Sequence, residues 1–134
     1  MPKELSFTEE IHYDDNLSGI TIPILLSYGE KSRRVQAKVD TGGEVCLFSR
    51  EDGTILGVPI DQGTPITLSS IGGNVEAFGH EVTIETGNLF FQSTVYFAKY
   101  PGLPRNILGR RGWLRNLKIA VIDYDNLLYL SAYN

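Results

Sequence analysis

The sequence predicts an all-β domain with one short helix near its C-terminal end. Apolar residues alternate with polar ones in several short runs, which is the pattern of half-buried strands. Gly, Pro, Asn and Asp separate these runs and are the residues that favour turns. The 134 residues are 42% apolar and 21% charged, values typical of a globular domain with its own core. We therefore expect a single domain over residues 1–134.

A β-hairpin is predicted in the first third of the chain. Residues 20–28 are rich in Ile and Leu, and Gly29 opens a polar turn before a second run at residues 33–40. Apolar and polar side chains alternate in the second run, so its apolar members share one face. These members are Val35, Ala37 and Val39. Asp40 then begins the loop at the far end of the hairpin.

Further strands follow, separated by loops that contain Gly or Pro. They are expected at residues 45–49, 66–69, 75–86, 89–98, 106–109, 118–124 and 127–132. Residues 54–57 are expected to form one helical turn. The longer helix is expected at residues 110–117, where Trp113, Leu114 and Leu117 have the i, i+1 and i+4 spacing of an apolar helix face.

The composition disfavours several classes of function. A net charge of −4 argues against nucleic-acid binding, which needs a concentrated basic face. With Cys46 as its single cysteine and His12 and His80 as its histidines, the sequence predicts no intrachain disulfide, metal site or cofactor. The first residues lack an apolar signal segment, and no later run is long enough to span a bilayer. We expect a soluble, cytoplasmic protein with no membrane partner.

The residues around Asp40 carry the strongest functional signal. An apolar and β-branched run leads to Asp40, and Thr41, Gly42 and Gly43 interrupt it before an apolar run resumes at residue 45. A carboxylate at the end of a strand, on a turn that glycine makes freely, is held rigidly and stays accessible. An ordinary β-turn is the simpler interpretation of these residues taken alone.

Two further motifs favour a catalytic interpretation. A glycine-rich tip, Ile71-Gly72-Gly73, lies between two predicted strands, and Asn106-Ile107-Leu108-Gly109-Arg110 precedes the predicted helix. Together with Val39-Asp40-Thr41-Gly42, they have the order and separations of the retropepsin-like aspartic proteases, single-domain relatives of pepsin typified by retroviral proteases. The chain resembles this family over residues 21–130. The resemblance implies a closed or partly open acid-protease β-barrel with a flap hairpin.

The resemblance also implies a role for each motif. Asp40 matches the catalytic aspartate, Thr41 the residue whose hydroxyl braces the partner's loop, and Gly42 the glycine whose backbone faces the substrate. The residues that match the tip of the flap, which closes over a bound peptide, are Ile71, Gly72 and Gly73. Those that match the apolar strand beneath the active-site loop are Ile107, Leu108 and Gly109.

A single Asp-Thr-Gly supplies half of the catalytic pair that the resemblance implies. Two carboxyl groups are needed, one as the base for water and one as the acid for the carbonyl oxygen. The resemblance therefore implies an aspartic endopeptidase that is a C2 homodimer, with one Asp40 from each chain and an extended peptide as substrate. Residues 1–18 are expected to be an irregular or dimer-contacting arm. A noncatalytic peptide-binding or dimerisation module on the same fold is the alternative.

The positions flanking the motifs add one expectation and one departure. Glu44 and Arg110 match an acidic residue and an arginine that pair in retroviral relatives, so we expect an ion pair that braces the active-site loop. Two independent surface charges are the alternative. Gly43 stands where relatives commonly carry Ala or Ser, which predicts a looser loop and a larger neighbouring subsite.

A cysteine protease is the competing hydrolase. Cys46 lies in the middle of a predicted strand between Val45 and Leu47, which favours a buried core thiol over a nucleophile. His80 lies within another alternating run and is expected to be an exposed strand residue.

Overall fold

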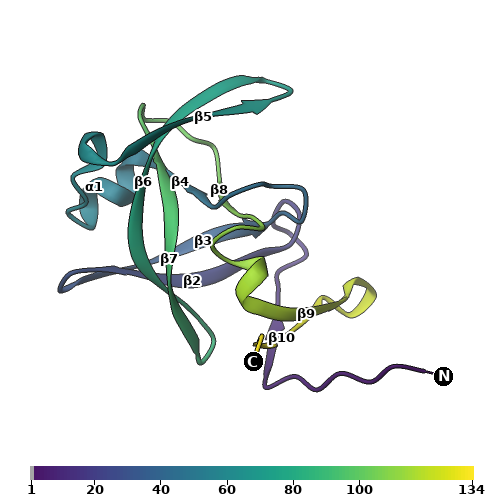
Figure 1. Cartoon of the computed structure of the whole chain (residues 1–134). Helices are drawn as coiled ribbons and strands as arrows, with labels where there is room; N and C mark the ends of the chain where they lie inside the picture. Colours follow the sequence, from purple (N-terminus) through teal and green to yellow (C-terminus); the bar gives the residue numbers. More distant parts are fainter. Residues whose placement is uncertain (1) are drawn as a thin grey trace.

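The computed structural model describes residues 2–134 and confirms the all-β fold (Figure 1). Six strands form a closed barrel in the order β2-β3-β8-β4-β7-β6, and β6 returns to pair with β2. Their bounds are β2 (Thr21–Tyr28), β3 (Lys31–Val39), β4 (Leu47–Phe48), β6 (Gly73–Thr86), β7 (Leu89–Ala98) and β8 (Asn106–Leu108). Closure pairs the two edges of the sheet with each other.

Two antiparallel hairpins supply four of the barrel strands, as the sequence predicts. β2 pairs with β3, and β6 pairs with β7. The turn residues Gly29 and Gly87 both have a φ of 59°, a left-handed conformation that glycine adopts without a Cβ clash. Because one face of each strand is buried, these short turns fix which side chains point inward.

Alternate residues of the strands fill the barrel. The inward side chains of β2 are completely buried, and the predicted apolar face of β3 is buried as well. The inward residues of these two strands are Ile22, Ile24, Leu26, Val35, Ala37 and Val39. Trp113 is fully buried in the same cluster, and its indole Nε1 donates a 3.1 Å hydrogen bond to Thr86 Oγ1. Each methylene removed from water in this cluster contributes about 0.8 kcal/mol.

β6 also takes part in a second hairpin, which carries the predicted flap residues at its tip. β5 (Thr64–Ser70) pairs antiparallel with the first half of β6, and the turn at Ile71 and Gly72 joins them. Figure 1 shows β5 and its turn projecting beyond the barrel. Ile71 is fully exposed, so its side chain does not pack against the other residues that the structure describes.

The helix lies elsewhere than predicted. Within residues 2–134 the structure has one α-helix, α1 (Arg50–Ile55), where Ser49 is the N-cap and its Oγ accepts a 3.1 Å hydrogen bond from the Asp52 N–H. Gly53 lies in its interior because a Cβ there would be 2.7 Å from the Phe97 ring. Without an apolar stripe, this six-residue helix gives no helical pattern in the sequence.

The predicted helix over residues 110–117 is wrong except for a single 3₁₀ turn, η2 (Leu114–Asn116). Arg111 forms a β-bridge with Val45, which keeps the start of this segment extended. Gly112 follows with a φ of +107°, and a Cβ there would lie 2.9 Å from the Thr94 carbonyl oxygen. Trp113 then leaves helical geometry to enter the core.

The chain ends meet in a separate three-stranded sheet with the order β1-β10-β9. The strands are β1 (Glu9–His12), β9 (Leu117–Ile122) and β10 (Leu127–Ala132). β9 and β10 were expected and β1 was not: Glu9–His12 form a strand within the arm expected to be irregular or dimer-contacting over residues 1–18, and the dimer contact stays a prediction. Leu128 and Leu130 of β10 are fully buried, and they join the same apolar cluster as the barrel.

Two 3₁₀ turns complete the fold. η1 (Ile60–Gln62) follows α1, and its Ile60 carbonyl oxygen is 2.9 Å from His80 Nε2. His80 is therefore half-buried against η1 and not the exposed strand residue expected from the sequence. η3 (Asp123–Asp125) joins β9 to β10. No helix within the described residues is long and apolar enough to cross a membrane.

Candidate active site

Asp40 follows the last residue of β3, at the point where the hairpin leaves the barrel. Its N–H donates a 2.9 Å hydrogen bond to the Leu108 carbonyl oxygen, which extends the parallel pairing of β3 with β8 by one residue. The preceding residue, Val39, is buried in the core and donates to the Ile20 carbonyl oxygen at 2.8 Å. These two hydrogen bonds fix the backbone at Asp40. Asp40 itself is only half-buried, so its side chain stays accessible.

The loop after Asp40 folds back over the carboxylate. The Gly42 N–H donates to Asp40 Oδ1 at 3.0 Å, and the Gly43 N–H donates to the Asp40 carbonyl oxygen at 3.1 Å. Thr41 lies exposed between them. Neither glycine has a positive φ, so the backbone conformation of this turn does not itself require glycine. Their missing side chains instead leave the space around Asp40 open, since a Cβ at either position would contact its carboxylate at 3.4–3.5 Å.

β8 supports this loop from beneath. Leu108 is fully buried, while Ile107 is half-buried and pairs with Lys38 of β3 and Leu47 of β4. Gly109 follows at the crossing point, where a Cβ would lie 2.1 Å from the Val45 carbonyl oxygen. Only glycine fits there, because the obstructing atoms belong to the backbone of the active-site segment.

The arginine that pairs with Glu44 is not the one predicted. Arg111 Nε lies 2.8 Å from Glu44 Oε1, whereas Arg110 is tied to the loop through its backbone N–H, which donates to the Gly43 carbonyl oxygen at 2.8 Å. The β-bridge between Val45 and Arg111 sets this register. The hydrogen bond and charge of Arg111 lower the pKa of Glu44 below its ordinary value of 4.5. Both side chains are exposed, so the pair contributes little stability.

The predicted flap residues lie at the tip of the β5–β6 hairpin. Gly73 has a φ of +122°, and the Ser70 hydroxyl donates to its carbonyl oxygen at 2.7 Å. Ile71 and Gly72 form the exposed turn before it. Within residues 2–134, no hydrogen bond joins this tip to the Asp40 loop. The predicted flap residues therefore lie on the β5–β6 hairpin. The Asp40 loop and its predicted supporting strand, β8, lie together at the end of β3.

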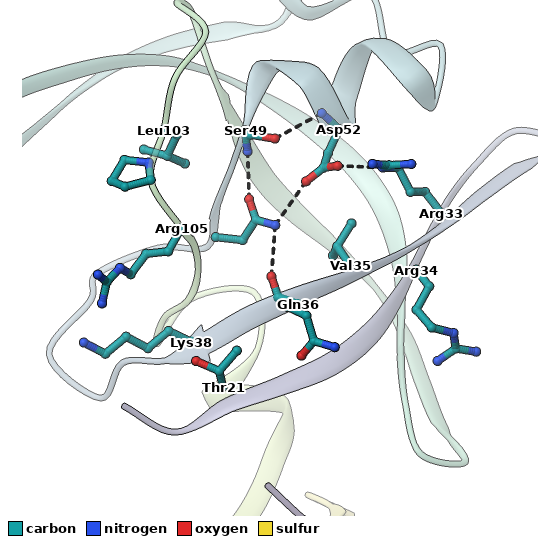
Figure 2. Close-up of a pocket in the computed structure, with 12 residues that line it drawn as sticks. Thr21, Arg33, Arg34, Val35, Gln36, Lys38, Ser49, Asp52, Leu103 and Arg105 are labelled. Atoms are coloured by element: carbon teal, nitrogen blue, oxygen red, sulfur yellow. Dashed lines mark hydrogen bonds and ion pairs between the residues drawn. The ribbon is translucent and has the colours of Figure 1, made fainter. Parts of the chain in front are cut away.

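Two cavities flank the loop of residues 99–105, which connects β7 to β8. One has a volume of about 280 Å³ and lies against the base of the β5–β6 hairpin, with Val75, Tyr100 and Leu103 among its lining residues. The other is a groove of about 410 Å³ over the outer face of β3 (Figure 2). Leu103 and Pro104 line both, so this loop is the wall between them.

Asn106 holds the wall of the groove together. The sequence indicated it only as the first residue of a strand and gave it no role of its own. Its Nδ2 donates to Asp52 Oδ2 and to the Gln36 carbonyl oxygen, both at 3.1 Å, and its Oδ1 accepts from the Ser49 N–H at 2.9 Å. Figure 2 draws these bonds as dashed lines that reach Ser49, Asp52 and Gln36. A polar residue opening an otherwise apolar strand is the signal that could have indicated it.

The rival nucleophile is confirmed as a core residue. Cys46 is completely buried, and burial raises the pKa of its thiol to about 11. A thiol in that state is a poor nucleophile at neutral pH. Within the described residues, no group of three His, Cys, Asp or Glu side chains could hold a metal ion.

No family model matches the chain, and no curated protein matches it in sequence. In structure it is similar to a retropepsin-like aspartic protease from Rickettsia conorii, with a TM-score of 0.66 and 18% identity over 94% of this chain and 99% of that one. It is also similar to the EIAV protease in complex with the inhibitor HBY-793, with a TM-score of 0.56 and 22% identity over 72% of this chain and 86% of that one. The closed barrel, the projecting hairpin and these two likenesses together show that the chain has the retropepsin-like fold.

Proposed function

We propose that the protein is an aspartic endopeptidase whose active site contains two copies of Asp40, one from each chain of a homodimer. The observation that carries this proposal is the placement of Asp40. It lies on an accessible loop that is bonded to Leu108 and packed against Gly109, in a fold shared with two solved aspartic proteases. A carboxylate with a fixed backbone and open surroundings is suited to activating water.

The chemistry explains why two chains are required. Two carboxyl groups held together cannot both ionise easily, so they share one proton, as is established for aspartic proteases. The ionised group takes a proton from water as it attacks the peptide carbonyl, and the protonated group donates to the carbonyl oxygen. The sequence has one Asp-Thr-Gly, so a two-fold axis near Thr41 and Gly42 supplies the second carboxyl group.

The flap and the loop after Asp40 are proposed to hold the substrate. An extended peptide adds as a strand between exposed backbone groups, and its alternate side chains occupy cavities. The turn at Ile71 and Gly72 can close over such a strand, because the Ile71 side chain is fully exposed and, among residues 2–134, nothing lies within 4 Å of the Gly72 Cβ position. The cavity at the flap base then becomes part of a subsite.

One experiment tests the proposal. The full chain and an Asp40→Asn variant are incubated with a random peptide mixture from acid to neutral pH, and cleavage is read by mass spectrometry. Sedimentation at the same concentrations establishes whether dimer is present. We expect cleavage by the unaltered chain and none by Asp40→Asn. Absence of Asp40-dependent cleavage at every pH, with dimer present, would favour the noncatalytic peptide-binding or dimerisation module instead.

A further inference from the structure

The groove over the outer face of β3 has an unusual concentration of positive charge. The groove is lined by four cationic side chains and by a single carboxylate. The cations are Arg33, Arg34, Lys38 and Arg105. This concentration occurs in a chain whose formal net charge is −4, so it is a local feature and not a reflection of composition.

The single carboxylate is already occupied. Asp52 is buried and lies 2.6 Å from Arg33 Nε, with its second oxygen held by Asn106. Arg33 and Asp52 therefore neutralise each other and form a fixed end wall. Within residues 2–134, no ion pair is formed by Arg34, Lys38 or Arg105, and the Arg105 guanidinium donates only to the neutral Ser18 hydroxyl, at 2.8 Å. Three positive charges remain for a ligand.

The groove adjoins the candidate active site. Side chains alternate along β3, with Val35, Ala37 and Val39 buried, so Lys38 lies on the outer face. Asp40 directly follows the strand and its N–H still pairs with the Leu108 carbonyl oxygen, so it lies two residues beyond Lys38, about 7 Å further along the extended backbone. Figure 2 shows Lys38 and Arg105 extending in the same direction at one end of the groove, with Arg34 at the other.

We propose that this groove binds an acidic side chain of the peptide substrate, within about three residues of the cleaved bond given the spacing along an extended chain. The proposal rests on the peptidase function proposed above and names its substrate class. Lys38 and Arg105 would contact the carboxylate, because an ammonium and a guanidinium both form charge-assisted hydrogen bonds with it. The neutral Gln36 side chain lines the same groove, and its amide can donate a further bond, whereas the Thr21 hydroxyl already donates to the Ser18 carbonyl oxygen at 2.8 Å.

The test measures binding without cleavage. Fluorescein-labelled octapeptides with an apolar central pair carry one Glu, placed in turn at each position beside that pair, and each has a Gln counterpart. Affinity for the full-length Asp40→Asn chain is measured by fluorescence anisotropy. We expect the best Glu peptide to bind about five- to tenfold more tightly than its Gln counterpart at low salt, with the difference shrinking at high salt. Equal affinities at every position would overturn the proposal.

Matched charge removals locate the effect. In the Asp40→Asn background, Arg105→Gln is expected to reduce the Glu-to-Gln ratio to about twofold or less, and Arg34→Gln to reduce it partially. Arg115→Gln removes the same charge from η2, outside the groove, and should leave the ratio unchanged. An equal loss in Arg115→Gln would assign the preference to overall charge and contradict the proposal. Circular dichroism checks that each variant is folded. If a groove variant does not fold, the salt dependence measured on the Asp40→Asn chain still tests the proposal.

Two further measurements, competition by phosphate and a comparison of binding with cleavage, distinguish the groove proposal from general charge attraction and from the peptidase proposal. Inorganic phosphate, compared at equal ionic strength with NaCl, should weaken binding of the Glu peptide and leave the Gln peptide unchanged, whereas equal weakening of both would contradict a groove that recognises the carboxylate. If Glu peptides bind selectively but nothing is cleaved, the acidic preference stands and the peptidase proposal fails. If peptides are cleaved without regard to acidic residues, the peptidase proposal stands and the groove proposal fails.

Discussion

Gly109 and Val45 cross so closely that a Cβ on Gly109 would lie 2.1 Å from the Val45 carbonyl oxygen. Two further backbone atoms, Val45 C and Gly43 O, would lie within 2.8 Å of it. This crossing joins the end of β8 to the segment that follows Asp40. The geometry of the candidate active site therefore depends on the absence of one methyl group.

Replacing Gly109 with Ala should destabilise the fold. The backbone must move to accept the methyl group, and overpacking of this kind costs about 1–3 kcal/mol or more. Urea unfolding followed by circular dichroism measures the loss. Gly72→Ala is the matched control, because nothing lies within 4 Å of its Cβ position, and its free energy of unfolding should change by less than about 0.5 kcal/mol. Equal effects of the two substitutions would contradict the close crossing.

Asn106→Leu should destabilise the protein although leucine has a similar size. The substitution removes three hydrogen bonds and leaves the buried Asp52 carboxylate and the Gln36 carbonyl each short of a donor, at a cost of roughly 2–4 kcal/mol. Thermal unfolding provides the measurement. Asn74→Leu, on an exposed part of β6, is the control and should have little effect. A neutral Asn106→Leu would show that this network does not hold α1 to β3.

The ion pair of Glu44 predicts a pH dependence with a defined sign. Its folded-state pKa is depressed by Arg111, so its stabilising contribution is present above the unfolded value of 4.5 and is lost as pH falls through the lower folded value. Arg111→Gln should return the Glu44 pKa toward 4.5, as read by carbon-detected NMR titration of the side-chain carboxyl. Arg110→Gln should move it less, since Arg110 acts only through its charge. A larger shift in Arg110→Gln would restore the pairing predicted from the sequence.

Cys46 should be unreactive while the protein is folded. Burial raises the pKa of its thiol to about 11, so almost no thiolate exists at pH 8, and its side chain is closed to solvent. A colorimetric disulfide reagent should react slowly in buffer and at once in denaturant. Rapid reaction of the folded chain would reopen the reading of Cys46 as a nucleophile.

Ile71→Ser should separate function from stability. Its side chain is fully exposed, so the free energy of unfolding should change by less than about 0.5 kcal/mol. If the flap tip closes over substrate, peptide cleavage at low substrate concentration should fall by roughly tenfold, because apolar contact with the substrate is lost. Unchanged cleavage would remove Ile71 from the proposed substrate-binding machinery.

Local patterns were enough to predict the barrel strands. The alternation of Val35, Ala37 and Val39 and the turn signals at Gly29 and Gly87 act within a few residues, so they are readable without knowing the rest of the chain. The motif containing Asp40 was also correctly placed at the end of its strand. The order of the motifs, more than any one of them, indicated the fold.

The features that sequence reasoning missed depend on distant partners. β1 forms because β10 offers an edge more than a hundred residues later, and its own residues, Glu9–His12, have no distinctive apolar alternation. The choice of Arg111 over Arg110 follows from one β-bridge, which no spacing rule reveals. The failed helix over residues 110–117 shows the same competition, since the burial of Trp113 outweighs a periodic spacing.

β1 pairs with β10 of its own chain, so this sheet forms without a strand from a second chain. Both terminal strands complete their own sheet and join the apolar cluster of the barrel, so a single chain can fold before it meets another. A folded monomer and an active dimer would then be linked by simple mass action. Below the dissociation constant, the rate of peptide cleavage should rise with the square of the protein concentration, and activity could be governed by abundance without any change in fold.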